Sequence, residues 1–157
     1  MDTVHAQGTR DLIDVFIVAA VRLYQQGLAR ALSDDRRCRV VGAAGNHEVA
    51  LERIFPMRPL PAGALIDVAA DPGLEGARLL NAGLTGVAVV AVAVADTDED
   101  AIACAETGVA GFVTRDTSLD GLIATVKCVA QEMGGLAKLV FSGGPTGTLR
   151  PGASAAW

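Results

Sequence analysis

Short apolar runs alternate with stretches of helical spacing along most of the 157-residue chain. The runs are rich in Val, Ile and Ala, and the stretches between them place apolar residues three or four positions apart, which is the spacing of one helix face. The fourth run is almost entirely Val and Ala, as expected of a strand covered on both faces. The predicted strands are residues 15–19, 39–42, 64–68, 87–94 and 111–113, and the predicted helices are residues 21–32, 48–54, 74–80, 99–106 and 119–133.

The last predicted helix has the clearest boundaries. Ser118 is a suitable N-cap, and Gly134-Gly135 ends the helix. Its apolar face carries Leu119, Leu122, Ile123, Val126, Ala130 and Met133. Five strand–helix units in strict alternation predict an α/β fold with a doubly wound, five-stranded parallel sheet, because right-handed crossovers place helices on both of its faces.

The composition changes after the last helix. Residues 11–135 contain every predicted strand and helix, whereas residues 136–157 are rich in Gly, Pro and Ser and lack the periodicity that forms a core. We expect the first range to be one folded domain and the second to be a linker or tail.

Charge and cysteine usage narrow the class of function. The formal net charge is −5 and no basic stripe is visible, so the domain itself is a poor candidate for contacting DNA. The longest apolar stretch, residues 86–95, is too short to span a bilayer, and the polar start lacks a signal pattern; we predict a cytoplasmic protein without a membrane partner. Cys38, Cys104 and Cys128 lack metal-binding spacing and are predicted to act as small buried hydrophobes.

The order and spacing of several groups of residues are shared with one family. These groups are Val15-Phe16-Ile17-Val18 with Leu23, Gly27-Leu28 and Ala31-Leu32; Val40-Val41-Gly42 with residues 48–52; Ala64-Leu65-Ile66-Asp67; and residues 108–116. Over residues 14–135 the chain resembles the receiver domains of bacterial two-component response regulators, in the branch with a LuxR-type helix-turn-helix output. The resemblance implies a receiver-like, flavodoxin-type sheet with strand order 2-1-3-4-5.

The resemblance also identifies a phosphoacceptor site that has lost its supporting groups. Asp67 matches the aspartate that accepts the phosphoryl group, but the acidic pair that helps to hold Mg²⁺ is replaced by Ala19 and Ala20. The hydroxyl residue at the end of the fourth strand aligns with Ala93, and the lysine after the fifth strand aligns with Arg115. Phe112 fills the aromatic switch position. Because Mg²⁺ needs several oxygen ligands, we expect no magnesium cofactor and no phosphorylation.

Three alternatives remain for these residues. Asp67 and Arg115 could form a fixed ion pair, or Asp71 and Asp96 could rebuild a metal site. The alanines could instead line an apolar crevice that admits a small organic ligand, unless neighbouring loops collapse into it. The expected crevice residues are Ala19, Ala20, Asp67, Ala69, Ala70, Ala93 and Arg115.

The resemblance implies the regulatory module of an atypical, phosphorylation-independent transcriptional regulator that acts as a homodimer or through partner binding. DNA would be contacted only through a C-terminal domain that is absent from this chain. The candidate dimer contacts on the last helix are Leu122, Thr125, Val129 and Met133. A small-molecule-sensing pseudo-receiver and a conventional phosphoacceptor using Asp67 are the alternatives. No nucleophile–base pair is visible, so we predict no enzyme activity and no catalytic residue.

Overall fold

A computed structural model describes residues 12–70, 72–134 and 146–148. The strands are β1 (Ile13–Val18), β2 (Cys38–Ala44), β3 (Gly63–Asp67), β4 (Ala88–Val94), β5 (Gly111–Thr114) and β6 (Thr146–Thr148). The helices are α2 (Arg22–Ser33), α3 (His47–Ile54), α4 (Leu74–Gly83), α5 (Asp98–Glu106) and α6 (Leu119–Gly134). Every predicted strand and helix is present, with boundaries that differ by a few residues.

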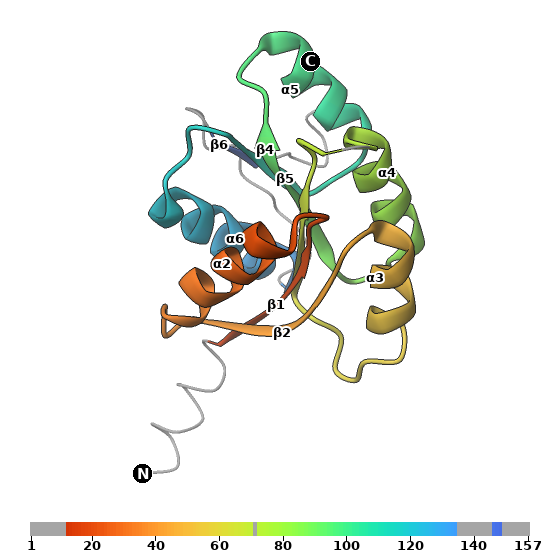
Figure 1. The fold of residues 1–157 in the computed structure, drawn as a ribbon, viewed down its shortest axis with the longest axis vertical. Helices are drawn as coiled ribbons and strands as arrows, with labels where there is room; N and C mark the ends of the chain where they lie inside the picture. The colour runs from red at the N-terminus through yellow and green to blue at the C-terminus, as the bar shows by residue number, and fades with distance from the viewer. Residues whose placement is uncertain (1–11, 71, 135–145, 149–157) are drawn as a thin grey trace.

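The sheet has the order β2-β1-β3-β4-β5-β6, and the pairs among its first five strands are parallel. This confirms the predicted order 2-1-3-4-5. Helices α2 and α6 cover one face of the sheet, and α3, α4 and α5 cover the other (Figure 1). None of the described helices is long and apolar enough to cross a membrane.

Strand β6 lies within the segment that the sequence predicts to be a linker. Its three residues pair antiparallel with β5, from Thr146 opposite Val113 to Thr148 opposite Gly111. A strand this short has no hydrophobic period of its own, and its pairing depends on the free edge of β5. The rest of the predicted tail lies outside the described residues.

The two core layers explain why the middle of each strand is apolar. Along β1, Val15 and Ile17 pack with the α2 and α6 side, whereas Phe16 and Val18 pack with the α3 and α4 side. Successive side chains of a strand point to opposite faces, so a sheet covered by helices on both faces needs apolar residues at every position.

Helix α6 begins as predicted, but its candidate dimer contacts face the core. Ser118 Oγ accepts a hydrogen bond from the Gly121 N–H at 3.1 Å, as an N-cap should. Leu122, Thr125 and Val129 are only 6%, 4% and 0% exposed. The prediction that they form a dimer surface is therefore wrong, because this face of the helix packs on the sheet. The side chain of Met133 lies outside the described part of the structure.

Close packing at Gly42 gives a stability prediction. A Cβ added there would lie 2.7 Å from a ring carbon of Phe16, which is fully buried and cannot move aside. Gly42→Ala should lower the free energy of unfolding by about 1–3 kcal/mol in urea denaturation. The matched control is Gly27→Ala in α2, where nothing lies within 4 Å. It should raise stability by about 0.5–1 kcal/mol, and equal effects of the two variants would contradict the packing described here.

Candidate functional site

Asp67 ends β3 at the carboxyl edge of the sheet, where its side chain is half-buried. One carboxylate oxygen, Oδ1, accepts a hydrogen bond from the Ala69 N–H at 2.9 Å. Aspartate often bonds its own backbone two residues further on, and this contact orients the carboxylate over the edge of the sheet.

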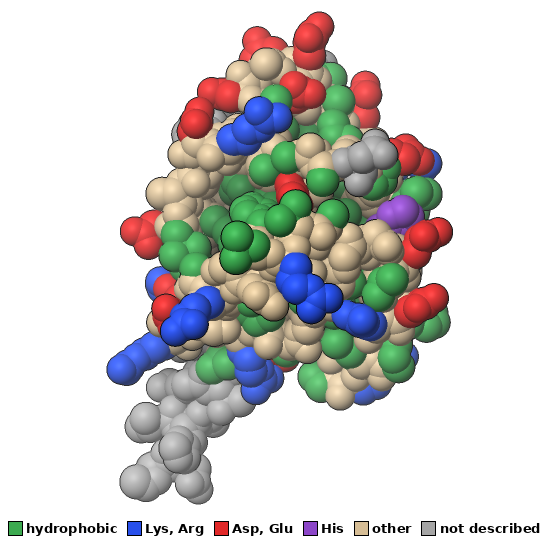
Figure 2. Space-filling model, in the orientation of Figure 1, with side chains coloured by type: hydrophobic (Ala, Val, Ile, Leu, Met, Phe, Trp, Pro, Cys, Tyr) green, Lys and Arg blue, Asp and Glu red, His purple; other side chains and the backbone are tan. Residues whose placement is uncertain are grey.

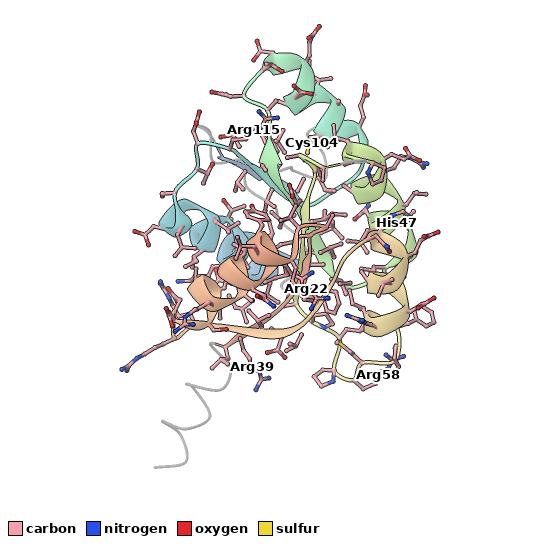
Figure 3. All side chains as sticks on the ribbon, in the orientation of Figure 1. Arg22, Arg39, His47, Arg58, Cys104 and Arg115 are labelled. Carbon is pink, nitrogen blue, oxygen red and sulfur yellow. The ribbon has the colours of Figure 1, made fainter. Side chains whose placement is uncertain are left out.

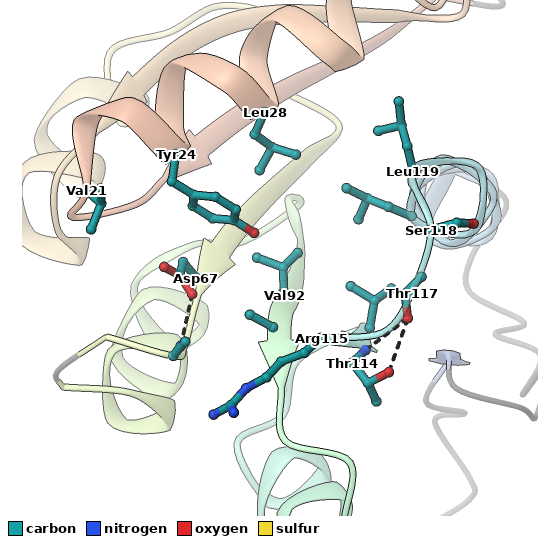
Figure 4. A pocket seen from close by; sticks show the side chains of 14 residues that line it. Val21, Tyr24, Leu28, Asp67, Val92, Thr114, Arg115, Thr117, Ser118 and Leu119 are labelled. Carbon is teal, nitrogen blue, oxygen red and sulfur yellow. Dashed lines mark hydrogen bonds between the residues drawn. The ribbon is translucent and has the colours of Figure 1, made fainter.

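The predicted ion pair between Asp67 and Arg115 is not formed. The ion pairs among the described residues are Arg37–Asp35, Arg39–Asp14 and Arg78–Glu75. Arg115 is exposed beyond the end of β5, and Figure 4 shows it at the same end of the pocket as Asp67 without a bond between the two side chains. An exposed arginine gains little from an ion pair in water, whereas the backbone N–H already satisfies Asp67 Oδ1.

The predicted crevice is divided into two hollows, with Asp67 in the wall of each. The first, which we call the small hollow, has a volume of about 30 Å³ and contains the predicted residues Ala19, Ala20 and Ala70. The second, which we call the α2–α6 groove, has a volume of about 510 Å³ and contains Ala69, Ala93 and Arg115. Figure 2 shows the groove as a hollow lined by apolar side chains with a carboxylate at its centre.

The small hollow contains few groups that could ligate a metal. Ala19 and Ala20 offer no side-chain oxygen, and Asn46 Oδ1 already accepts the Val49 N–H at 2.8 Å to cap α3. Among the described residues, no group of three or more His, Cys, Asp or Glu side chains is placed to hold a metal ion. Asp71 lies outside the described residues. The described donor set, one free carboxylate, does not fit Mg²⁺.

Gln25 closes the sheet edge beside the small hollow, and the sequence reasoning missed it. Its Nε2 donates to the Ala19 and Ala44 carbonyls, both at 3.0 Å, and so joins the ends of β1 and β2. The only signal in the sequence was a polar side chain in the first turns of a helix that follows a buried strand. The Ala44 carbonyl also accepts the Ala19 N–H at 3.0 Å, so the Gln25 amide reinforces a backbone contact between the two strand ends.

His47 also lines the small hollow, at the start of α3. Its Nδ1 is buried and has no hydrogen-bond partner in the described structure. His47 and Arg115, both labelled in Figure 3, line different hollows, although Asp67 is common to the two linings.

Ala93 adopts a backbone conformation that L-residues rarely take, with φ at +65°. The register of β4 against β5 shifts between Ala91 and Val94, so Ala93 lies in a bulge of the strand. A β-branched residue such as threonine is strongly disfavoured at positive φ. The resemblance predicts a hydroxyl residue at this position, but the positive φ of Ala93 disfavours threonine there.

Phe112 points into the core rather than toward either hollow. It is 9% exposed and packs in the layer beneath α3, α4 and α5. Cys38 and Cys104 are buried as predicted, and Cys128 is half-buried. Burial raises the pKa of the Cys104 thiol to about 12, so this thiol stays protonated near neutral pH.

The α2–α6 groove brings together residues that the sequence could not group. Helix α2 contributes Val21, Tyr24 and Leu28, and α6 contributes Leu119 and Leu122. The strands and the β5–α6 loop contribute Asp67, Ala69, Val92, Ala93, Val113, Thr114, Arg115, Thr117 and Ser118. Burial and the nearby charge of Asp67 raise the pKa of Tyr24, so the hydroxyl keeps its proton.

Comparison with known proteins identifies the type of domain. No protein-family model matches the chain. Over 118 residues it is 27% identical to the response regulator GacA of Pseudomonas protegens, covering 75% of this chain and 55% of GacA. The GacA of Pseudomonas viridiflava gives the same identity and coverage.

Solved structures give the same result. The signal receiver domain of the putative response regulator NarL from Mycobacterium tuberculosis has a TM-score of 0.66 and 25% identity, covering 76% of this chain and 97% of that domain. A LuxR-family two-component response regulator from Aurantimonas sp. SI85-9A1 has a TM-score of 0.67 at 16% identity, covering 76% of this chain and 86% of the other. The chain has the fold of a response-regulator receiver domain and is similar to response regulators over three quarters of its length.

This receiver domain spans about half the length of the curated relatives that it matches. The match therefore supports the receiver fold of the chain. The match does not show that this chain shares the output functions of those longer proteins.

The strained backbone of the receiver domain at Ala93 can be tested directly. Ala93→Gly removes the Cβ that disfavours positive φ, and it should raise the free energy of unfolding by about 1 kcal/mol. Ala91→Gly, in the same strand but without positive φ, should lower it by about 1 kcal/mol. Urea denaturation of both variants measures the difference. Destabilisation of both to the same extent would show that Ala93 is not strained.

Proposed function

We propose that this receiver domain regulates its output without being phosphorylated. The observation that carries the proposal is the loss of polar side chains around Asp67. It faces Ala19 and Ala20 in the small hollow, and the strand-four position, in the α2–α6 groove, is Ala93 at positive φ. Each of these positions supplies a polar group in the receivers that this chain resembles. Here they supply methyl groups.

Electrostatics supports the same conclusion. A phosphoryl group would add about two negative charges beside the sheet edge, where no metal-binding cluster is formed by the described residues. The small hollow has a volume of about 30 Å³, which leaves room for little more than one water molecule. The exposed Arg115 is screened by solvent and does not bond to Asp67, so it offsets little of the repulsion.

Self-association is the proposed means of signalling. Exposed apolar side chains gather where α2 begins and on α6: Val21 is 55% exposed, Leu23 80%, Tyr24 40% and Leu119 41%. Strand β6 pairs along the β5 edge and covers it, whereas the α2 and α6 side stays accessible. A homodimer on this face would set the spacing of attached DNA-binding domains in a transcriptional regulator.

Beryllofluoride with Mg²⁺ mimics an aspartyl phosphate and tests the first part of the proposal. We expect no change in melting temperature or molar mass for the wild type, and the same result for Asp67→Asn. A stabilisation that requires both reagents and disappears in Asp67→Asn would establish a conventional phosphoacceptor. Differential scanning fluorimetry and light scattering measure both quantities.

The Ala19→Asp/Ala20→Asp double variant is the matched gain-of-function control. Two added carboxylates beside Asp67 supply the oxygen ligands that Mg²⁺ needs, so the variant should gain measurable Mg²⁺ affinity by isothermal titration calorimetry. Lack of any gain would mean that Asp67 is not directed at the small hollow.

Two single variants test the dimer face, each placing one carboxylate on a different face of the molecule. Leu23→Asp places a carboxylate within the exposed α2 patch and should weaken self-association at least tenfold in sedimentation equilibrium. The control is Ile102→Asp on α5, where the side chain is 52% exposed on the opposite face of the sheet. A larger effect of Ile102→Asp would assign the interface to the α5 side instead.

A further inference from the structure

The α2–α6 groove has the size and lining of a small-molecule site. Its volume of about 510 Å³ falls in the usual range for ligand pockets. Its apolar lining includes Val21 and Leu28 of α2, Leu119 and Leu122 of α6, and Val92 of β4. Figure 4 shows Leu28 and Leu119 on the two helices that border the pocket. The groove contains Asp67, Ala93 and Arg115 of the degenerate phosphoacceptor site, whereas Ala19 and Ala20 line the small hollow.

Two polar groups that line this apolar groove have hydrogen-bonding capacity that the described residues leave unfilled. The described hydrogen bond of the Asp67 carboxylate goes to Oδ1, and none is formed by Oδ2. The Tyr24 hydroxyl likewise has no hydrogen bond in the described part of the chain, and Figure 4 shows it directed into the pocket. A half-buried carboxylate without a full set of donors is a favourable acceptor for a ligand that brings one.

The charges around the groove select for an uncharged ligand. Asp67 is negative and Arg115, on the same lining, is positive. An anion would be repelled by the half-buried carboxylate, and a cation would have to give up its hydration against the apolar walls. A neutral hydroxyl group can donate to the carboxylate without either cost, while its hydrocarbon part covers the apolar walls.

We propose that the α2–α6 groove binds a small, uncharged, mainly apolar organic molecule whose hydroxyl group donates a hydrogen bond to Asp67. The inference rests on the proposed function, because it requires an Asp67 that carries no phosphoryl group. Such a ligand would contact α2 and α6 at once. It would therefore shift self-association through these helices by as much as its affinity differs between monomer and dimer.

The test uses 2-naphthol as the probe, with naphthalene, 2-naphthoate and 2-naphthylmethylammonium as matched compounds that change only the polar group. Isothermal titration calorimetry without Mg²⁺ should show one 2-naphthol bound per domain, about tenfold tighter than the other three. Asp67→Asn should reduce 2-naphthol binding to about the level of naphthalene, since the charge-assisted hydrogen bond is lost.

A pair of tryptophan variants locates the site. Val21 lines the groove and is 55% exposed, so Val21→Trp should block it and abolish binding without disturbing the core. Leu23 is 80% exposed and does not line the groove, so Leu23→Trp should bind 2-naphthol like the wild type. Backbone amide shifts in two-dimensional NMR should move in α2, β4 and the β5–α6 loop.

The proposal is overturned by several results. These are an absence of 2-naphthol binding up to its solubility limit, equal binding of naphthalene, and binding that survives Val21→Trp. The beryllofluoride experiment reports separately on phosphorylation, so its outcome distinguishes failure of the proposed function from failure of this site.

Discussion

A parallel sheet buried on both faces is the constraint on which the rest of this receiver domain depends. Helices cover both sides, so strand residues such as Phe16 and Ile17 must be apolar whichever way they point. Polar and charged side chains are excluded from the sheet interior and can gather only at its ends. The carboxyl edge, where Asp67 ends β3, is the place where ligands bind in folds of this kind.

What the carboxyl edge can do depends on how its backbone groups are satisfied. The Gln25 side-chain amide joins the ends of β1 and β2, and the Ala69 N–H donates to the Asp67 carboxylate. Groups of the chain itself therefore make both of these contacts at the edge. Ala93 holds a conformation unsuited to threonine. Each feature stabilises one arrangement of the edge without a metal ion. Together they favour a fixed site over one that responds to phosphorylation.

Alanines line both hollows at this edge, but the two hollows differ greatly in volume. Beside Ala19 and Ala20 the neighbouring residues fill the space, and only about 30 Å³ remains. Between α2 and α6 a groove of about 510 Å³ stays open, because long side chains on the two helices form walls instead of meeting. Asp67 lies in the wall of both. The same carboxylate therefore loses its place in one kind of chemistry and becomes available to another.

The sequence by itself determined the strands, the helices, their alternation and the strand order, together with Asp67 and the alanines that face it. These follow from local periodicity and from the order of segments, which need no knowledge of packing. Only the tertiary structure decided that Gln25 bridges two strands, that Ala93 has positive φ and that Asp67 does not bond to Arg115. It also turned Leu122, Thr125 and Val129 into the core and paired β6 with β5. These features depend on where distant elements meet, to within about an ångström, and hydrophobic spacing along one chain carries no such information.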